Sequence, residues 1–201
     1  MITAIILAAG DSSRMGRPKA LLQWRGKPFL EHVCASLRSA GVEDRVVVLG
    51  HASKEILAAW TPVGEKVTVN LKPEHGQLSS LRAGLGFASE YTEAFMVCLA
   101  AQPTVLPDTC KKIIEFWSYR KEYIVIPRTL RASDSKLKRG HPIIIPARYK
   151  SLCFEGPLEK GLHWVNHNPL VKIDDLEVPD PEIIRDIDTQ EDYEALVYLV
   201  E

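Results

Sequence analysis

The sequence predicts an α/β domain in which helices cover a sheet. Short apolar runs of strand length alternate with apolar stripes at helical spacing, which is the pattern of layered α/β domains. With 201 residues, 46% hydrophobic and 25% charged, the chain has the composition of a globular protein. One domain is the default at this length, so we expect a single domain over residues 1–201.

The strands are expected where apolar runs are bounded by polar or turn-forming residues. A buried opening strand is the first of them. In chain order, the predicted strands are Ile2–Leu7, Arg45–Leu49, Lys66–Asn70, Phe95–Leu99, Tyr123–Ile126, Pro142–Ile145 and Val171–Glu177.

Helices are expected where apolar residues recur every three or four positions. The first stripe is Phe29, Val33 and Leu37, and Gly41 is expected to end that helix. The later stripes are Leu78, Leu81, Leu85 and Ala88, then Cys110, Ile113, Ile114 and Trp117 after Pro107, and finally Tyr193, Leu196, Val197 and Val200. Thr189 and Asp192 resemble a capping box before the last helix. The polar segment 129–140 lacks apolar periodicity and is expected to be a long loop or flap.

Charge and cysteine usage limit the possible partners and location. The formal net charge of −1 provides no general attraction to nucleic acid or to a membrane surface, so neither is an expected partner. The apolar run at the start is too short for a signal peptide or a membrane span. The four cysteines form no Cys-x-x-Cys pair and are expected to be buried thiols. We therefore expect a cytoplasmic protein.

The most informative segment is the loop after the first strand, residues 7–22. Glycines such as Gly10 allow the main chain to approach a ligand, and Arg14 and Lys19 add two fixed cations. Together they suit a nucleotide triphosphate. The spacing fits neither the dinucleotide fingerprint nor the P-loop. An ordinary solvated loop is the alternative, but loop composition alone does not explain this order of residues.

This segment, with LAAG, RMG and PK in register, resembles the signature of sugar-nucleotide-type nucleotidyltransferases. More narrowly, it is similar to the MobA/MocA-like group that acts on the molybdenum cofactor. The resemblance implies a three-layer, Rossmann-like fold with a mixed, mostly parallel sheet. It also implies that Arg14 and Lys19 bind the triphosphate as catalytic cations. The loop that would wrap the base and phosphates contains Leu7, Ala8, Ala9, Gly10 and Ser12.

A second segment, residues 70–84, leaves a predicted strand and enters a predicted helix at Gly76. Open N–H groups at the start of a helix, with the Ser79 and Ser80 hydroxyls, suit polar contacts to a base or ribose. A serine-rich joint between strand and helix is the alternative. The segment resembles the Asn…Gly…Ser-Leu-x-x-Gly stretch of the family, which contacts the nucleotide base, and this favours the functional interpretation.

A third segment resembles the Arg-Gly-His-Pro turn of the MocA-like branch, which precedes a strand beside the acceptor pocket. Here the turn contains Gly140, His141 and Pro142. A histidine in such a turn is often structural, so a role on the substrate side and a structural role both remain open for His141.

A fourth segment contains Asp186 and Asp188, two carboxylates one residue apart. Such a pair suits a hard divalent cation, which prefers oxygen ligands. The pair could equally serve the start of the following helix, where negative charge is favourable. It resembles the family's Asp-Ile-Asp-Thr-Pro-Glu-Asp ending, with Gln190 in place of proline, and both aspartates are therefore candidate metal ligands.

One position departs from the family. Ala101 stands where the family has the aspartate of Asp-Gln-Pro, which holds the magnesium ion that bridges the nucleotide phosphates. A methyl group cannot coordinate a metal. Charge stabilisation by a metal contributes roughly several kcal/mol in such transfers, so its loss predicts a weakened enzyme unless another carboxylate substitutes. Asp11, Asp186 and Asp188 are the candidate substitutes.

The resemblance therefore implies a nucleotidyltransferase that uses Mg²⁺. It is expected to transfer CMP from CTP to a small phosphorylated acceptor, such as a molybdopterin-type cofactor, and to release pyrophosphate. CTP is favoured over GTP because Ala9 stands where the guanylyl branch has a glycine and narrows the space beside the base. The alternative is a nucleotide- or cofactor-binding protein without turnover, and Ala101 is its support.

Overall fold

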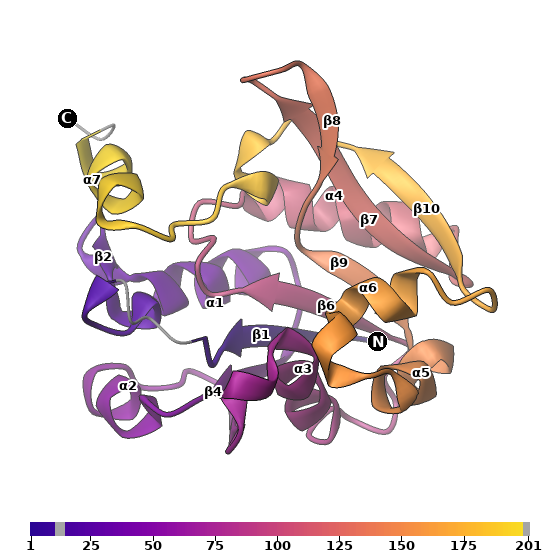
Figure 1. Ribbon diagram of the computed structural model, residues 1–201, viewed down its shortest axis with the longest axis horizontal. Helices are drawn as coiled ribbons and strands as arrows, with labels where there is room; N and C mark the ends of the chain where they lie inside the picture. Colours follow the sequence, from indigo (N-terminus) through magenta and orange to yellow (C-terminus); the bar gives the residue numbers. More distant parts are fainter. Residues whose placement is uncertain (11–14, 199–201) are drawn as a thin grey trace.

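The computed structural model describes residues 1–10 and 15–198. In these residues, eight strands form one mixed sheet in the order β10-β7-β9-β6-β1-β4-β5, with β8 paired to β7 (Figure 1). The strands of this sheet are β1 Ile2–Ala8, β4 Asp44–Leu49, β5 Lys66–Val69, β6 Ala94–Leu99, β7 Tyr123–Arg131, β8 Lys136–Arg139, β9 Ile143–Pro146 and β10 Lys172–Glu177. Two further strands, β2 Gln23–Trp24 and β3 Lys27–Pro28, form a separate small hairpin.

Helices cover both faces of the sheet (Figure 1). The α-helices are α1 Phe29–Ser39, α2 Ser53–Ala59, α3 Gln77–Leu85, α4 Pro107–Ser118, α5 Lys150–Glu155, α6 Gly161–Asn166 and α7 Gln190–Tyr198. Short 3₁₀ helices occupy Lys19–Leu21, Pro73–His75, Ala147–Tyr149, Leu158–Lys160 and Pro181–Ile184. None of the helices in the described residues is long and apolar enough to span a bilayer.

Two apolar cores, one on each face of the sheet, hold the three layers together. Neighbouring residues of β1 point to opposite faces, so Ile6 packs in the core beneath α1 and α4 while Ile5 packs in the core beneath α3, α5 and α6. Both side chains are fully buried. The predicted layered fold is therefore confirmed, and β1, β4 and β6 are buried parallel strands, as continuous apolar runs predict.

The segment 129–140 is not a loop, so the sequence-based prediction was wrong. It forms most of a hairpin in which β7 continues to Arg131 and pairs with β8, at the top of Figure 1. The strands escaped prediction because β8 is exposed along its whole length and carries no apolar alternation. Leu130 and Leu137 form an exposed cross-strand pair instead.

Two smaller sequence predictions are confirmed. The four cysteines are free and buried. At the last helix, the backbone N–H of Asp192 donates to Thr189 Oγ1 at 3.2 Å, and the Asp192 carboxylate accepts from the Thr189 N–H at 2.9 Å, which is a capping box. Helix α7 also contacts the small hairpin, because the Tyr193 hydroxyl donates to the carbonyl of Gln23.

Candidate functional site

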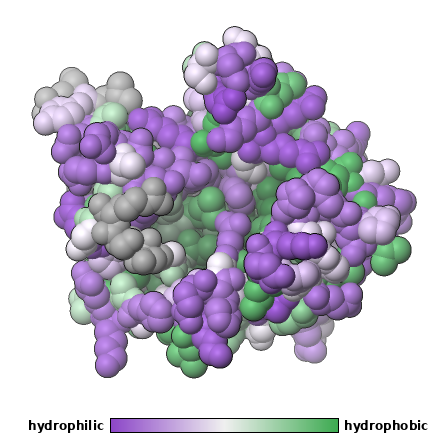
Figure 2. Space-filling model, in the orientation of Figure 1, coloured by the Kyte–Doolittle hydropathy of each residue, from purple (hydrophilic) through white to green (hydrophobic). Residues whose placement is uncertain are grey.

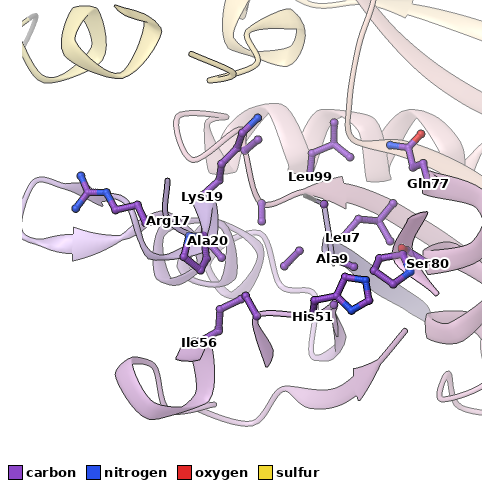
Figure 3. A pocket seen from close by; sticks show the side chains of 18 of the residues that line it. Leu7, Ala9, Arg17, Lys19, Ala20, His51, Ile56, Gln77, Ser80 and Leu99 are labelled. Atoms are coloured by element: carbon purple, nitrogen blue, oxygen red, sulfur yellow. The ribbon is translucent and has the colours of Figure 1, made fainter. Parts of the chain in front are cut away.

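A cavity of about 730 Å³ opens at the carboxyl ends of β1, β4 and β6. Ligands of open α/β sheets bind at this edge, where the loops leave the strands. Figure 2 shows the molecule hollowed near the centre of this face, with hydrophobic side chains in the hollow and hydrophilic ones around the rim. In Figure 3, Lys19 and Ser80 lie on opposite sides of Leu7 and Ala9.

The loop after β1 supplies one part of the lining. Leu7, Ala8, Ala9 and Gly10 all line the cavity, as does Lys19 beyond them. Ser12 and Arg14, which the sequence assigns to the same loop, lie outside the described residues.

Close backbone packing fixes this loop against the end of β4. A Cβ atom built on Gly50 would lie 2.5 Å from the carbonyl oxygen of Ala9, which leaves room for glycine alone. A Cβ on Gly10, in contrast, would meet no atom of the described residues within 4 Å.

The start of α3 forms the opposite wall. Gly76 adopts a φ of +86°, which favours glycine, and it lines the cavity together with Gln77 and Ser80. The Ser80 side chain is buried, and its hydroxyl accepts from Asn70 Nδ2 at 3.0 Å.

Ser79 does not line the cavity. Its single hydroxyl proton is shared between the carbonyl oxygens of Lys72 and Gly76 instead, so Ser79 stabilises the loop before α3. Of the two serines that the sequence places at the base, the structure brings only Ser80 to the cavity.

The carboxylates expected to bind metal also reach the cavity. Asp186 and Asp188 line it beside Ala101. Asp188 forms an ion pair with Lys19, so the cation expected at the triphosphate and a carboxylate expected at the metal meet at one end of the cavity. Burial raises the pKa of Asp186, and the nearby charge of Asp188 raises it further, against a hydrogen bond from Gln102 and the charges of Lys138 and Lys19.

These aspartates belong to a segment that we call the strap, residues 180–188. The strap runs along the loop that follows β6, residues 100–106. The N–H of Ile187 donates to the carbonyl of Ala101 at 3.3 Å, and the buried Asp180 carboxylate accepts from the N–H of Leu106 and the hydroxyl of Thr109. These contacts place the two carboxylates next to Ala101, the position at which the family resemblance predicts an aspartate.

The turn of Gly140, His141 and Pro142 does not line the cavity. The N–H of His141 donates to the carbonyl of Ile183 at 2.9 Å, so the turn supports the strap from behind. Burial lowers the pKa of His141 to about 4, which keeps the ring neutral at physiological pH. A role of this turn on the substrate side therefore stays a prediction.

Several lining residues escaped sequence reasoning. Arg17, His51 and Glu55 line the cavity, and Gln102 lies directly behind it. Arg17 lies within the Gly-rich loop segment, between Gly16 and Lys19, so its position in that motif could have identified it. His51 and Glu55 follow β4, and the sequence carries no motif there.

Comparisons with known proteins agree with this geometry. A family model described as the MobA-like NTP transferase domain matches residues 4–166. Nicotine blue oxidoreductase of Paenarthrobacter nicotinovorans is 30% identical over 148 residues, which are 73% of this chain and 71% of that protein. The molybdenum cofactor guanylyltransferase of Xanthomonas euvesicatoria is 37% identical over 95 residues, 47% of this chain and 44% of that protein. The bifunctional protein GlmU of Sorangium cellulosum is 33% identical over 114 residues, which are 53% of this chain and 24% of that protein.

Solved structures extend the likeness over nearly the whole chain. Rv0371c from Mycobacterium tuberculosis has a TM-score of 0.86 and 28% identity, over 98% of this chain and 97% of that one. A structure of Rv0371c in complex with manganese has a TM-score of 0.81 and 27% identity, over 98% of each chain. Since the family model covers most of the sequence and the fold is shared, the chain belongs to the MobA-like NTP transferase domain family.

Proposed function

We propose that this protein is a Mg²⁺-dependent nucleotidyltransferase that transfers CMP from CTP to a phosphomonoester, such as a molybdopterin-type cofactor, and releases pyrophosphate. One observation carries the proposal. One cavity at the carboxyl ends of the parallel strands is lined by the described part of the Gly-rich loop, by Lys19 and by the carboxylates of Asp186 and Asp188. The guanylyltransferase among the relatives supports the same class of reaction.

In the proposed reaction, an acceptor phosphate oxygen forms a bond to the α-phosphorus of CTP. The bond from that phosphorus to the oxygen bridging the α- and β-phosphates breaks, and pyrophosphate leaves with the electron pair. The chain provides positioning and charge rather than a covalent intermediate. Lys19 would stabilise the triphosphate and the leaving pyrophosphate, and Arg14 is predicted to assist from the same loop.

The residues present fit a magnesium ion. In residues 1–10 and 15–198, no group of three or more His, Cys, Asp or Glu side chains is arranged to hold a metal. Magnesium, however, is commonly held by one or two carboxylates together with substrate phosphates. Asp186 and Asp188 supply that number, and a bound cation would offset the burial that raises the pKa of Asp186. A bound ion would neutralise charge that develops on the phosphate oxygens. The manganese complex of Rv0371c supports a divalent cation in this fold.

The methyl group of Ala9, which is expected to narrow the space beside the base, supports the preference for CTP. Ala9 is buried, and its carbonyl lies against the Gly50 backbone, so the methyl group has little freedom to move aside. A contact of this size discriminates about 10- to 200-fold between ligands.

Titration calorimetry of CTP, GTP and ATP with Mg²⁺, followed by a pyrophosphate-release assay with a panel of phosphomonoesters, tests the proposal. We expect CTP to bind about 10- to 200-fold more tightly than GTP. Tighter binding of GTP would refute the base preference alone. If none of the three nucleotides binds, the transferase proposal itself is wrong.

A second candidate function is nucleotide or cofactor binding without nucleotidyl transfer. Two observations favour it. The family resemblance predicts a metal-binding aspartate at position 101, where this chain has alanine. In addition, one of the relatives, which is similar over 148 residues, is named an oxidoreductase. CTP binding with no pyrophosphate release from any acceptor, in the wild type and in Ala101→Asp alike, would support this candidate.

A further inference from the structure

Gln102 is a buried polar side chain directly beside the site, and the proposed reaction leaves it without a role. It follows Ala101 on the loop after β6 and is 4% exposed. Its own N–H donates to the carbonyl of Leu99, which fixes the backbone of the turn. Burying an amide costs free energy unless its hydrogen bonds are made, so the partners of this side chain show what it does.

The amide nitrogen of Gln102 makes two hydrogen bonds, both to the strap. Nε2 donates to Asp186 Oδ1 at 3.0 Å and to the carbonyl of Ile183 at 3.2 Å. Because an amide nitrogen carries two protons, both are used. The side chain therefore bridges the loop after β6 to a strap residue that is 84 positions away in the sequence.

The other contacts between the strap and the loop after β6 do not hold a carboxylate that lines the cavity. Asp180 and Glu182 bind the start of α4 and Thr104, and the Ile187 N–H binds a backbone carbonyl. Of these contacts between the strap and the loop, the Gln102 amide is the one that holds a cavity-lining carboxylate.

A neutral amide and a cation differ in how they affect the charge of the carboxylate that they bind. The amide binds one oxygen of Asp186 without adding a positive charge, whereas the Lys19 ammonium compensates the charge of Asp188 in an ion pair. Partners behind a metal-binding carboxylate fix its orientation in this manner. We propose that Gln102 is a positioning residue that orients Asp186 toward the divalent cation of the transfer reaction, and this inference rests on the proposed function.

The test is Mn²⁺ binding to the full chain, followed by electron paramagnetic resonance with and without CTP. Gln102→Met keeps the size of the side chain and removes both hydrogen bonds. It should weaken Mn²⁺ binding roughly 10- to 100-fold, the usual effect of losing a partner behind a metal ligand. Gln190→Met, which removes an exposed amide bonded to Glu194, is the matched control and should leave Mn²⁺ binding unchanged.

A double-mutant cycle with Asp186→Asn separates positioning from general loss of structure. If Gln102 acts through Asp186, Gln102→Met causes no further loss of Mn²⁺ affinity once Asp186→Asn is present. Equal losses in both backgrounds would overturn the inference. Should Gln102→Met fail to fold, Gln102→Asn retains an amide that is too short to reach Asp186 and should show the same loss.

The inference and the proposed function fail in different ways. Unchanged Mn²⁺ binding in Gln102→Met, with weakened binding in Asp186→Asn, overturns the role of Gln102 and leaves the metal role of the strap intact. Absence of Mn²⁺ binding in the wild type, with and without CTP, overturns both the metal role of the strap and the inference on Gln102. Nucleotide binding, on which the transferase proposal depends, is measured independently by calorimetry with CTP.

Discussion

The two sides of the cavity differ in the residues that form them: small residues and backbone on one side, charged side chains on the other. On the strand side, backbone and small residues pack closely, as Ala9 does against Gly50. On the strap side, charged groups face one another, with Lys19 paired to Asp188 and Asp186 beside them. Substitutions on the strand side should therefore change shape and stability, whereas those on the strap side should change charge and chemistry.

Ala101→Asp tests the strap side with the largest expected effect. It adds an oxygen ligand beside Asp186 and Asp188, at the place where the family has one. We expect Mg²⁺-dependent pyrophosphate release to rise about tenfold or more, since each 1.36 kcal/mol of added stabilisation is about tenfold in rate. Without metal, the third carboxylate should lower the Tm, and Mn²⁺ should restore it.

The opposite result for Ala101→Asp is also informative. If the wild type already turns over at an ordinary rate and the added aspartate changes nothing, the strap carboxylates anchor the ion by themselves. Asp188→Asn should then abolish pyrophosphate release.

Lys19→Ala has the next largest expected effect. A compact cation at the end of the Gly-rich loop suits the β- and γ-phosphates, and a hydrogen bond to a charged group contributes about 1.5–3 kcal/mol. Binding of CTP should weaken roughly 10- to 100-fold, while binding of CMP should change little, as calorimetry would measure. The control is Lys27→Ala, a surface lysine in β3. Equal losses for CTP and CMP would remove Lys19 from the phosphate site.

Two glycine substitutions on the strand side form a matched pair. Gly50→Ala places a methyl group 2.5 Å from the Ala9 carbonyl and should cost about 1–3 kcal/mol in the free energy of unfolding, measured by urea titration. Gly10→Ala meets no atom of residues 1–10 or 15–198 within 4 Å and should leave stability nearly unchanged, although it adds a group at the cavity. Similar destabilisation by both would contradict close packing at Gly50.

The smallest expected effect concerns the capping box at the end of the strap. Hydrogen bonds from Thr189 hold the pKa of Asp192 below its ordinary value, although its slight burial opposes this. The stabilisation is therefore present above the ordinary aspartate range and is lost as the pH falls through the lowered pKa. Thr189→Ala should cost about 1 kcal/mol near pH 7, roughly 2–4 °C in Tm. This difference should shrink in acid, and a constant difference would argue against the capping box.

Local patterns in the sequence predicted most of the fold. The strands β1, β4 and β6 are buried on both faces, and their continuous apolar runs show this directly. The β7–β8 hairpin escaped because the pairs Arg131–Lys136 and Thr129–Lys138 leave no apolar alternation to detect. Those two strands are defined by the backbone hydrogen bonds between β7 and β8, and sequence patterns do not reveal such bonds.

The candidate site was predictable where a motif lies within one segment. Lys19, Gly76 and Asp186 were named from such segments, and all three line the cavity. Ser79 and Ser80 are neighbours on α3 and point in different directions, so only one of them reaches the cavity. The contact between Gln102 and the strap joins distant parts of the chain, and no local spacing indicates it.

The position of the strap in the chain also sets the order in which the site is completed during protein synthesis. Gln102 is made 84 residues before Asp186. At roughly 5–20 residues per second, about 4–17 s pass between them on the ribosome. During that interval the amide that will be buried has no partner from the strap. The nascent chain thus holds the glycine-rich wall of the cavity well before it holds either carboxylate, and the capacity to bind a metal there arrives last.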